Sequence, residues 1–285
     1  MAPWPSRWIS EVGMRNGRPN EFIYQVAALL IAVIVVHGLY VTVVRPRAEV
    51  DLALQTAQLQ IDPGAVPERS PWIIIRDFEQ EACFVLMLWA MAMMAAKWVA
   101  TTRETRLLDS NLIPLASGIR ILPEDAREYT RQIQALPPKK RNALLPRALE
   151  SALRRFGATG SIQAASETAH TACETEADRL DSELSMVRYI AWAIPSIGFI
   201  GTVRGIGNAL GQAHKAVEGE ISGVTQSLGT AFNSTFIALL ISIVLMFLLH
   251  QLQLQQERLV LDTSGYIDDR LVQHLQRAAP GGGGE

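Results

Sequence analysis

The fold is decided by YIAWAIPSIGFIGTVRGIGNALGQ (Tyr189–Gln212) and, after a short polar turn, ISGVTQSLGTAFNSTFIALLISIVLMFLL (Ile221–Leu249). Each segment is long enough for a transmembrane helix, which needs about 20 apolar residues to cross the hydrocarbon core of a bilayer. The second segment continues without Asp, Glu, Lys or Arg as far as Gln256, further than a soluble core helix requires. Because small and hydroxylated residues interrupt both segments, we predict a membrane hairpin with polar groups placed inside it.

Two more apolar stretches precede this hairpin. Phe22–Val44 contains no charged residue, and Ala82–Ala100 contains only one, Lys97 in its last turn. The first stretch is too long for a signal-peptide core, so we expect it to remain in the mature protein. Lysines and arginines after the second stretch and before the third place the middle of the chain in the cytoplasm by the positive-inside rule. We therefore predict an all-α integral membrane protein with four transmembrane helices and both termini in the cytoplasm.

Helical periodicity extends the last two helices beyond the bilayer. Small and apolar residues recur every three or four positions from Ala165 to Ala191, which predicts one helix running from Ser161 into the third span. Leu252 and Leu259 prolong the fourth helix in the same way. The predicted layout is a cytoplasmic N-terminal segment (1–21), transmembrane helix 1 (22–44), a periplasmic loop (45–81), transmembrane helix 2 (82–100), a cytoplasmic helical domain (101–186), transmembrane helix 3 (187–212), a short periplasmic turn (213–226), transmembrane helix 4 (227–250), a cytoplasmic C-terminal helix (251–279) and a linker-like tail (280–285).

Composition argues against several classes of function. A formal net charge of −2 gives no basic surface for nucleic acid. The two cysteines stand in unrelated contexts, and no His/Cys spacing typical of a metal site occurs. We find no nucleophile–base pair and no phosphate-binding loop, so we predict a protein that is not an enzyme and needs no cofactor.

Small and polar residues share the hairpin. Small residues spaced by three and four form a ridge on each helix that lets helices approach closely, and we assign helix packing to Pro195, Gly198, Gly201, Gly205, Ala231 and Ala238. The polar residues at the same depth are Thr202, Thr230, Asn233, Ser234 and Thr235. An unsatisfied polar group in hydrocarbon costs several kcal/mol, so these side chains are expected to line an ion pathway or contact a partner helix. The alternative is that they only pack.

Charged groups in the spans are few. Arg204 is the one arginine well inside an apolar segment; it is expected to serve either as an interfacial anchor or in ion access or pairing with a carboxylate. His37 in the first span is either functional or a hydrogen-bonded structural histidine. The predicted spans contain no acidic residue. If the protein moves protons, we therefore expect the titrating carboxylate to come from another chain.

Two motifs in the hairpin resemble a known family. PSIGFIGTVRGI (195–206) resembles the P-x-x-G-x-x-G-T-V-x-G-[MI] signature of the MotA/TolQ/ExbB proton-channel family, and ISGVTQSLGTAF (221–232) resembles the segment that follows it. The likeness covers about the last third of the chain. Two features depart from the ExbB pattern: Asn233-Ser234-Thr235 replaces the usual Gly-Leu, and Ala238-Leu-Leu-Ile stands where A-I-P closes the last span. Four spans in place of three are closer to the MotA layout.

The resemblance implies a motor stator subunit in the bacterial inner membrane. Such subunits form a homopentamer around a dimer of single-span MotB/TolR/ExbD-like proteins, whose membrane helix carries an Asp that binds H⁺ or Na⁺. The family's inner-helix threonines, which face that Asp, correspond to Thr202 and Thr230 here. Ion flow would then drive mechanical, rotary work on the cell envelope. Two alternatives are a non-conducting membrane scaffold and a solute transporter, although we see none of the internal repeats that transporters typically carry.

Overall fold

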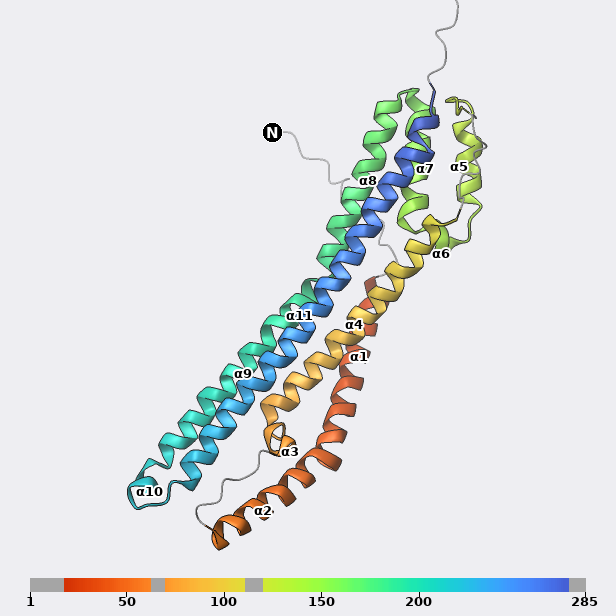
Figure 1. The fold of residues 1–285 in the computed structure, drawn as a ribbon. Helices are drawn as coiled ribbons and strands as arrows, with labels where there is room; N and C mark the ends of the chain where they lie inside the picture. The colour runs from red at the N-terminus through yellow and green to blue at the C-terminus, as the bar shows by residue number, and fades with distance from the viewer. Residues whose placement is uncertain (1–17, 63–69, 111–119, 277–285) are drawn as a thin grey trace, which may run out of the picture. The chain divides into compact units, whose positions relative to one another are not determined.

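The structure is a computed structural model that describes residues 18–62, 70–110 and 120–276 (Figure 1). Within these ranges the chain is helical, and its only strand-like feature is an isolated parallel bridge between Ile121 and Leu275. The predicted N-terminal segment and the linker-like tail lie outside the described residues, apart from residues 18–21.

The N-terminal half begins with helices that follow one another closely. The elements are α1 (Arg18–Leu39), a π-helical turn (Tyr40–Val44), α2 (Arg45–Ile61), α3 (Pro71–Ile74) and α4 (Phe78–Leu108). The chain stays helical through Val44, so the backbone places no break where the sequence predicts the first span to end. Pro46 lies within this continuous helical stretch, directly after the π-helical turn, and lacks the N–H group that would donate to a carbonyl of that turn.

The remaining elements include the predicted hairpin. They are α5 (Ala126–Gln134), α6 (Pro138–Arg141), α7 (Leu144–Thr159), α8 (Ile162–Glu183), α9 (Ser185–Gly211), α10 (Ala213–Val217), α11 (Ser222–Arg270) and a 3₁₀ turn (Val272–His274). Helices α9 and α11 lie side by side, joined by the short α10 (Figure 1). The helix expected to run unbroken from Ser161 is interrupted by a one-residue turn at Leu184, between α8 and α9.

Four helical stretches are long and apolar enough to cross a membrane. They span Phe22–Ile61, Phe78–Leu108, Ile162–Gly211 and Ser222–His274. This confirms the prediction of an all-helical chain with four long apolar helices. The membrane boundaries and the sidedness stay predictions, because length and composition alone identify these stretches.

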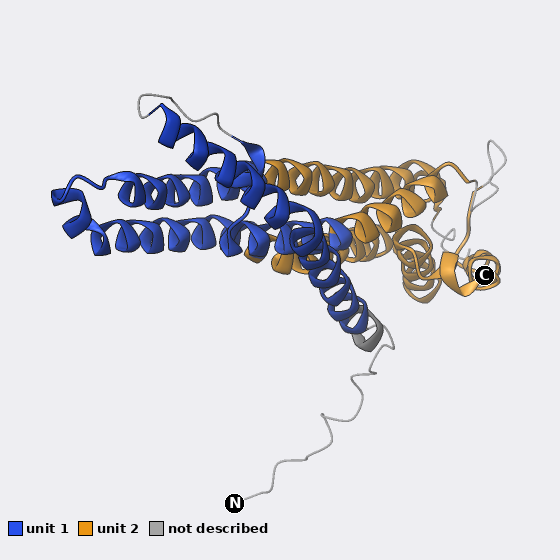
Figure 2. Ribbon diagram, turned by 90° about the horizontal axis from the view of Figure 1, so that it is seen from below, with its two compact units in different colours: residues 1–93, 190–243 blue, residues 94–189, 244–285 orange. Residues whose placement is uncertain are grey.

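The chain divides into two compact units (Figure 2). Unit 1 comprises residues 1–93 and 190–243, and unit 2 comprises residues 94–189 and 244–285. Helices α4, α9 and α11 each contribute residues to both units. We describe each unit separately.

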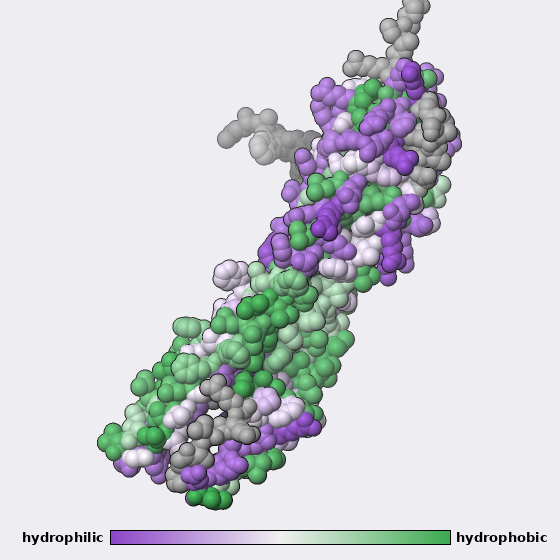
Figure 3. Space-filling model, in the orientation of Figure 1, coloured by the Kyte–Doolittle hydropathy of each residue, from purple (hydrophilic) through white to green (hydrophobic). Residues whose placement is uncertain are grey.

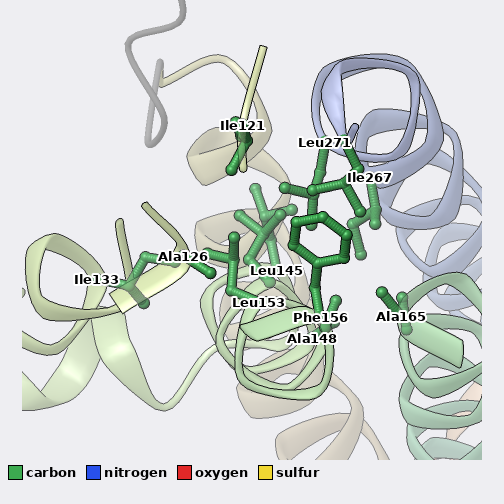
Figure 4. Packing of buried hydrophobic residues seen from close by; sticks show 14 of the residues in the cluster. Ile121, Ala126, Ile133, Leu145, Ala148, Leu153, Phe156, Ala165, Ile267 and Leu271 are labelled. Carbon is green, nitrogen blue, oxygen red and sulfur yellow. The ribbon is translucent and has the colours of Figure 1, made fainter. Parts of the chain in front are cut away.

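Unit 2 has a core of large apolar side chains. Leu149, Leu153 and Phe156 of α7 are fully buried, and residues of α5, α8 and the end of α11 pack around them (Figure 4). Apolar residues recur at helical spacing on the buried face of α7, while its exposed face carries arginines. Gly160 ends this helix in the left-handed conformation, at φ 62°, that glycine adopts without strain. This is the organisation of a water-soluble helical domain.

Unit 1 presents large apolar side chains on its outside (Figure 3). Phe199 on α9 is 64% exposed and Phe232 on α11 is 68% exposed, whereas Ala231 and Ala238 between the two helices are fully buried. A helix surface of this kind is stable when its solvent is lipid. Unit 1 therefore has the surface expected of a membrane-spanning bundle.

Candidate functional site

Helices α9 and α11 touch where their small residues face each other. A methyl group added at Gly205 would lie 2.6 Å from Ala231 Cβ, and one added at Gly201 would lie 2.6 Å from Ser234 Cβ. Gly198 faces Ala238 in the same way. At these positions the α9 backbone fits against α11 only because glycine has no side chain. The residues assigned to packing, with the exception of Pro195, thus lie at the contact between the two helices.

Pro195 has a different consequence. Proline has no N–H group, so inside α9 it leaves the carbonyl of Ala191 without its usual intrahelical donor. The Ser242 hydroxyl on α11 donates a hydrogen bond to this carbonyl at 3.2 Å. An unpaired carbonyl in lipid would cost several kcal/mol, so Ser242 supplies what Pro195 removes. Sequence analysis did not identify Ser242, although a proline within a predicted span is a reason to look for a compensating hydroxyl.

Two of the predicted polar residues meet between α9 and α11. The hydroxyls of Thr202 and Thr235 form a hydrogen bond with each other. Thr202 Oγ1 also lies 3.0 Å from the Ala231 carbonyl, and Thr235 Oγ1 donates to the Gly198 carbonyl at 3.1 Å. Each hydroxyl therefore has a choice of acceptors within reach.

The other three predicted polar residues differ in their contacts. Ser234 is buried; it donates to the Thr230 carbonyl at 3.0 Å and accepts from Gln80 Nε2 at 3.4 Å. Thr230 and Asn233 are half-buried, and no residue that the structure describes forms a hydrogen bond with either side chain. A half-buried amide and hydroxyl without a partner are groups on α11 that can bind something outside the chain.

Arg204 pairs with a carboxylate of its own chain. Its Nη2 atom lies 2.7 Å from Glu79 Oε2, in the first turn of α4. The Glu79 side chain is 11% exposed and the Arg204 side chain 42% exposed. The sequence left two roles open for Arg204, an interfacial anchor and a role in ion access or pairing with a carboxylate. The structure contains a carboxylate pair, between Arg204 and Glu79. Because α4 begins at Phe78, four residues before the predicted second span, Glu79 lies on the same helix as that span but outside its predicted bounds.

The next two residues of α4 are also polar and buried. Gln80 is fully buried and donates from Nε2 to the Ile74 carbonyl at 3.1 Å, as well as to Ser234. Glu81 lies 2.6 Å from His37 Nδ1 and 2.6 Å from Arg45 Nη2. His37 is thus held by a carboxylate, and Glu81 joins α4 to α1 and α2. The two N-terminal helices and the hairpin are linked to α4 through three consecutive side chains.

Aspartate 77, just before α4, belongs to the same group. Burial raises the pKa of the Asp77 carboxyl above its usual value, and the guanidiniums of Arg76 and Arg204 oppose this shift. Arg76 Nε lies 3.8 Å from Asp77 Oδ1. Positive charge near Asp77 therefore comes both from its neighbour in the chain and from α9.

These polar groups lie away from the closed end of the hairpin. At a rise of about 1.5 Å per residue, Arg204 is about 10 Å before Gly211, the last residue of α9. The apolar side chains of Ile206 and Leu210 follow it and are exposed. An ionisable group among apolar side chains is costly unless it is paired, and both Glu79 and Glu81 form ion pairs. We name Thr202, Arg204, Thr230, Asn233, Ser234 and Thr235 with Glu79, Gln80 and Glu81 the polar belt.

The α4 members of this belt, Glu79, Gln80 and Glu81, were not predicted from the sequence, and the reason is physical. The prolines around residues 63–71 suggested a loop that ends only at Glu81, and charged residues are usually assigned to the water side of a span boundary. The available signal was the triplet Glu79-Gln80-Glu81 directly before an uncharged run, where acidic residues favour the N-terminus of a helix.

The chain was compared with known proteins. The model of the family described as MotA/TolQ/ExbB proton channel family matches residues 140–264, which include α9, α10 and most of α11. No curated protein and no solved structure matches the chain.

Proposed function

We propose that this chain, whose residues 140–264 form a MotA/TolQ/ExbB proton channel family domain, is the ring-forming subunit of an ion-driven motor unit. It is a multi-pass membrane protein of a family found in the bacterial inner membrane, and the channels of this family are not enzymes. The observation that carries the proposal is that this domain contains Thr230 and Asn233, polar side chains on α11 without a partner in the described chain.

In the proposed assembly five copies surround a dimer of single-span MotB/TolR/ExbD-like proteins, and both termini are cytoplasmic. The α9–α11 hairpin of each copy would face the enclosed helices. A carboxylate on such a helix needs donors in an apolar surrounding, and the Thr230 hydroxyl and Asn233 amide can supply them. The Thr202 and Thr235 hydroxyls can change acceptors without any movement of the backbone.

Proton flow would produce movement by changing the charge of that carboxylate. The ionised form requires hydrogen-bond donors, whereas the protonated form does not, so each protonation state prefers a different place on the ring. A proton that crosses the membrane releases about 2.3 kcal/mol per 100 mV. Alternating charge could thus turn the ring stepwise around the dimer and perform mechanical work on the envelope.

Replacement of Thr230 by valine tests this function. The full chain is co-expressed with a single-span MotB/TolR/ExbD-like protein that carries an Asp in its membrane helix, and the purified complex is placed in liposomes. A hydrogen bond to a charged group is worth about 1.5–3 kcal/mol, so T230V should reduce proton flux roughly 10- to 100-fold while the ring still assembles. T225V is the matched control on the same helix, because the exposed Thr225 hydroxyl bonds to its own helix at Ile221. Unchanged flux in T230V would contradict the proposal.

A second candidate is a non-conducting scaffold subunit. It is favoured by the hydroxyls of Thr202, Ser234 and Thr235, all of which are hydrogen-bonded within the chain as packing alone would require. Particle images of the purified complex distinguish the two functions. A pentameric ring that encloses two partner helices supports the motor unit, and a ring with a lipid-filled or empty centre supports the scaffold.

A further inference from the structure

The first turn of α4 carries polar side chains that take no part in the proposed contact with the partner carboxylate. Its residues Glu79, Gln80 and Glu81 reach three different neighbours: Arg204 on α9, Ser234 on α11, and the pair His37 and Arg45 on α1 and α2. The part of α11 in unit 1 contains no Asp, Glu, His, Lys or Arg. Carboxylates near the hydroxyls of α11 are therefore supplied by α4.

Glu79 lies directly against the hairpin. A methyl group added at Gly201 would lie 2.7 Å from Ser234 Oγ and 3.1 Å from Glu79 Cγ. Both side chains thus occupy the space that opens because Gly201 has no Cβ. The Glu79 side chain therefore lies next to Ser234 of α11 at Gly201.

Gln80 offers an acceptor in the same place. Its amide orientation is fixed, because Nε2 points at the Ile74 carbonyl, which can only accept a hydrogen bond. Gln80 Oε1 is consequently a buried acceptor with no hydrogen-bond partner among the described residues. A buried acceptor of this kind, next to Glu79 and Ser234, is satisfied by a donor from outside the chain, and water that carries a proton is such a donor.

The two carboxylates of this turn are held differently. Glu81 is shared by two groups, because its carboxylate oxygens lie 2.6 Å from His37 Nδ1 and 2.6 Å from Arg45 Nη2. Glu79 has one such contact, with Arg204, whose side chain is 42% exposed. The charged and titratable groups that the structure relates to Glu79 are Arg204 on α9, Asp77 before α4 and the Cys83 thiol one turn further along α4. Glu79 therefore has a single ion pair, and its partner is partly exposed.

We propose that Glu79 is the group through which the coupling proton passes from water to the hydroxyls of α9 and α11, an inference that rests on the proposed function. A hydronium ion gives its proton to the Glu79 carboxylate, which becomes a neutral acid and releases Arg204. The acid then gives the proton to water hydrogen-bonded to Gln80 Oε1 and Ser234 Oγ. The carboxylate is restored and pairs with Arg204 again. In the proposed topology this turn lies toward the outer side, from which protons enter.

The test compares E79Q with E218Q in the full-chain complex in liposomes. Glu218 follows α10 and is exposed, so E218Q makes the same change of charge near the closed end of the hairpin. Proton flux should fall about 100-fold in E79Q, as is typical when a positioned proton-transfer group is lost, and stay near the wild-type value in E218Q. Wild-type flux in E79Q would overturn the inference.

A charge exchange separates proton transfer from structural pairing. The double variant E79R/R204E restores an ion pair but moves the carboxylate from α4 to α9. We expect its complex to assemble and its proton flux to remain low. If the exchange restored flux, Glu79 would have only a structural role and the inference would fail.

A measurement that does not depend on flux keeps the two proposals apart. A wild-type complex without flux would contradict the proposed function. Infrared titration of the purified full chain then decides the inference: a carboxyl band that forms on acidification and is missing in E79Q supports it, and an identical titration of E79Q overturns it. Flux in the wild type that follows Na⁺ and not pH would also overturn it.

Discussion

Units 1 and 2 differ most in the residues that they expose. In unit 2 the side chains of Leu149, Leu153 and Phe156 are fully buried, and arginines and glutamates cover the outside. In unit 1 the alanines Ala231 and Ala238 are fully buried where α11 meets α9, and phenylalanines lie outside. Large apolar groups are buried when the solvent is water, because removal of apolar surface from water is worth about 25 cal/mol per Å². Against lipid this gain vanishes, and close contact of backbones takes its place.

The two units also satisfy their polar groups differently. In unit 2 the buried Glu176 lies 3.1 Å from Arg147 and 3.3 Å from Arg179, and both arginines reach solvent. In unit 1 hydroxyls bind backbone carbonyls of the neighbouring helix, as Thr235 does with Gly198. A charge can be kept at low cost where water reaches one partner, whereas a hydroxyl adds polarity without a net charge. The ion pairs of Glu79 and Glu81, in the first turn of α4, depart from this pattern within unit 1. They distinguish this turn as part of the candidate functional site.

The largest expected effect tests the core of unit 2. F156A removes a fully buried aromatic ring and should destabilise unit 2 by about 3–5 kcal/mol. Hydrogen exchange of α7 amides in the purified full chain would measure it. L261A is the control, because Leu261 on α11 is 69% exposed and its truncation should cost about 0.5 kcal/mol or less. Equal effects of the two variants would show that unit 2 is not held by this core.

The next effect runs in the opposite direction, from small to large. G205A places a methyl group 2.6 Å from Ala231 Cβ and should cost about 1–3 kcal/mol through separation of α9 and α11. G207A on the same helix adds its methyl group to open space and should be neutral. Stability of the full chain in mixed micelles, titrated with a denaturing detergent, measures both. If G205A were as stable as G207A, close backbone contact would not be what holds unit 1 together.

This contrast accounts for how much the sequence could predict. A long uncharged run such as Phe22–Val44 identifies an apolar helix regardless of what that helix packs against. The four long helices could therefore be predicted from the sequence. The spacing of Gly198, Gly201 and Gly205 indicated a packing ridge, and the structure places these residues against α11. The family motif in residues 195–206 could be recognised because it is local in sequence.

Contacts between distant segments could not be predicted in this way. Glu79 and Arg204 are separated by 125 positions, and no periodicity relates them. The same holds for Gln80 and Ser234, and for His37 and Glu81. A hydropathy profile assigns charged residues to the water side by default, whereas a charge paired in three dimensions can lie deeper. The three members of the polar belt that the sequence did not reveal, Glu79, Gln80 and Glu81, were therefore the ones that depend on tertiary structure.

The smallest effect concerns the hydroxyl pair of unit 1. A double-mutant cycle with T202V and T235V isolates the coupling between the two hydroxyls, which should be about 0.6 kcal/mol, the average for hydrogen bonds between membrane helices. Detergent titration of the four full-chain variants gives this value, and proton flux gives the effect of the same changes on transport. In a non-conducting scaffold, T202V and T235V together would remove only this small coupling energy from the stability of the chain. If flux instead falls much further than that energy accounts for, the hydroxyls of this pair act on the ion as well as on the packing, because stability alone cannot transmit so large a change. Flux that stays proportional to stability would assign both hydroxyls to packing, and Thr230 and Asn233 would then be the polar groups of the hairpin left to face a partner.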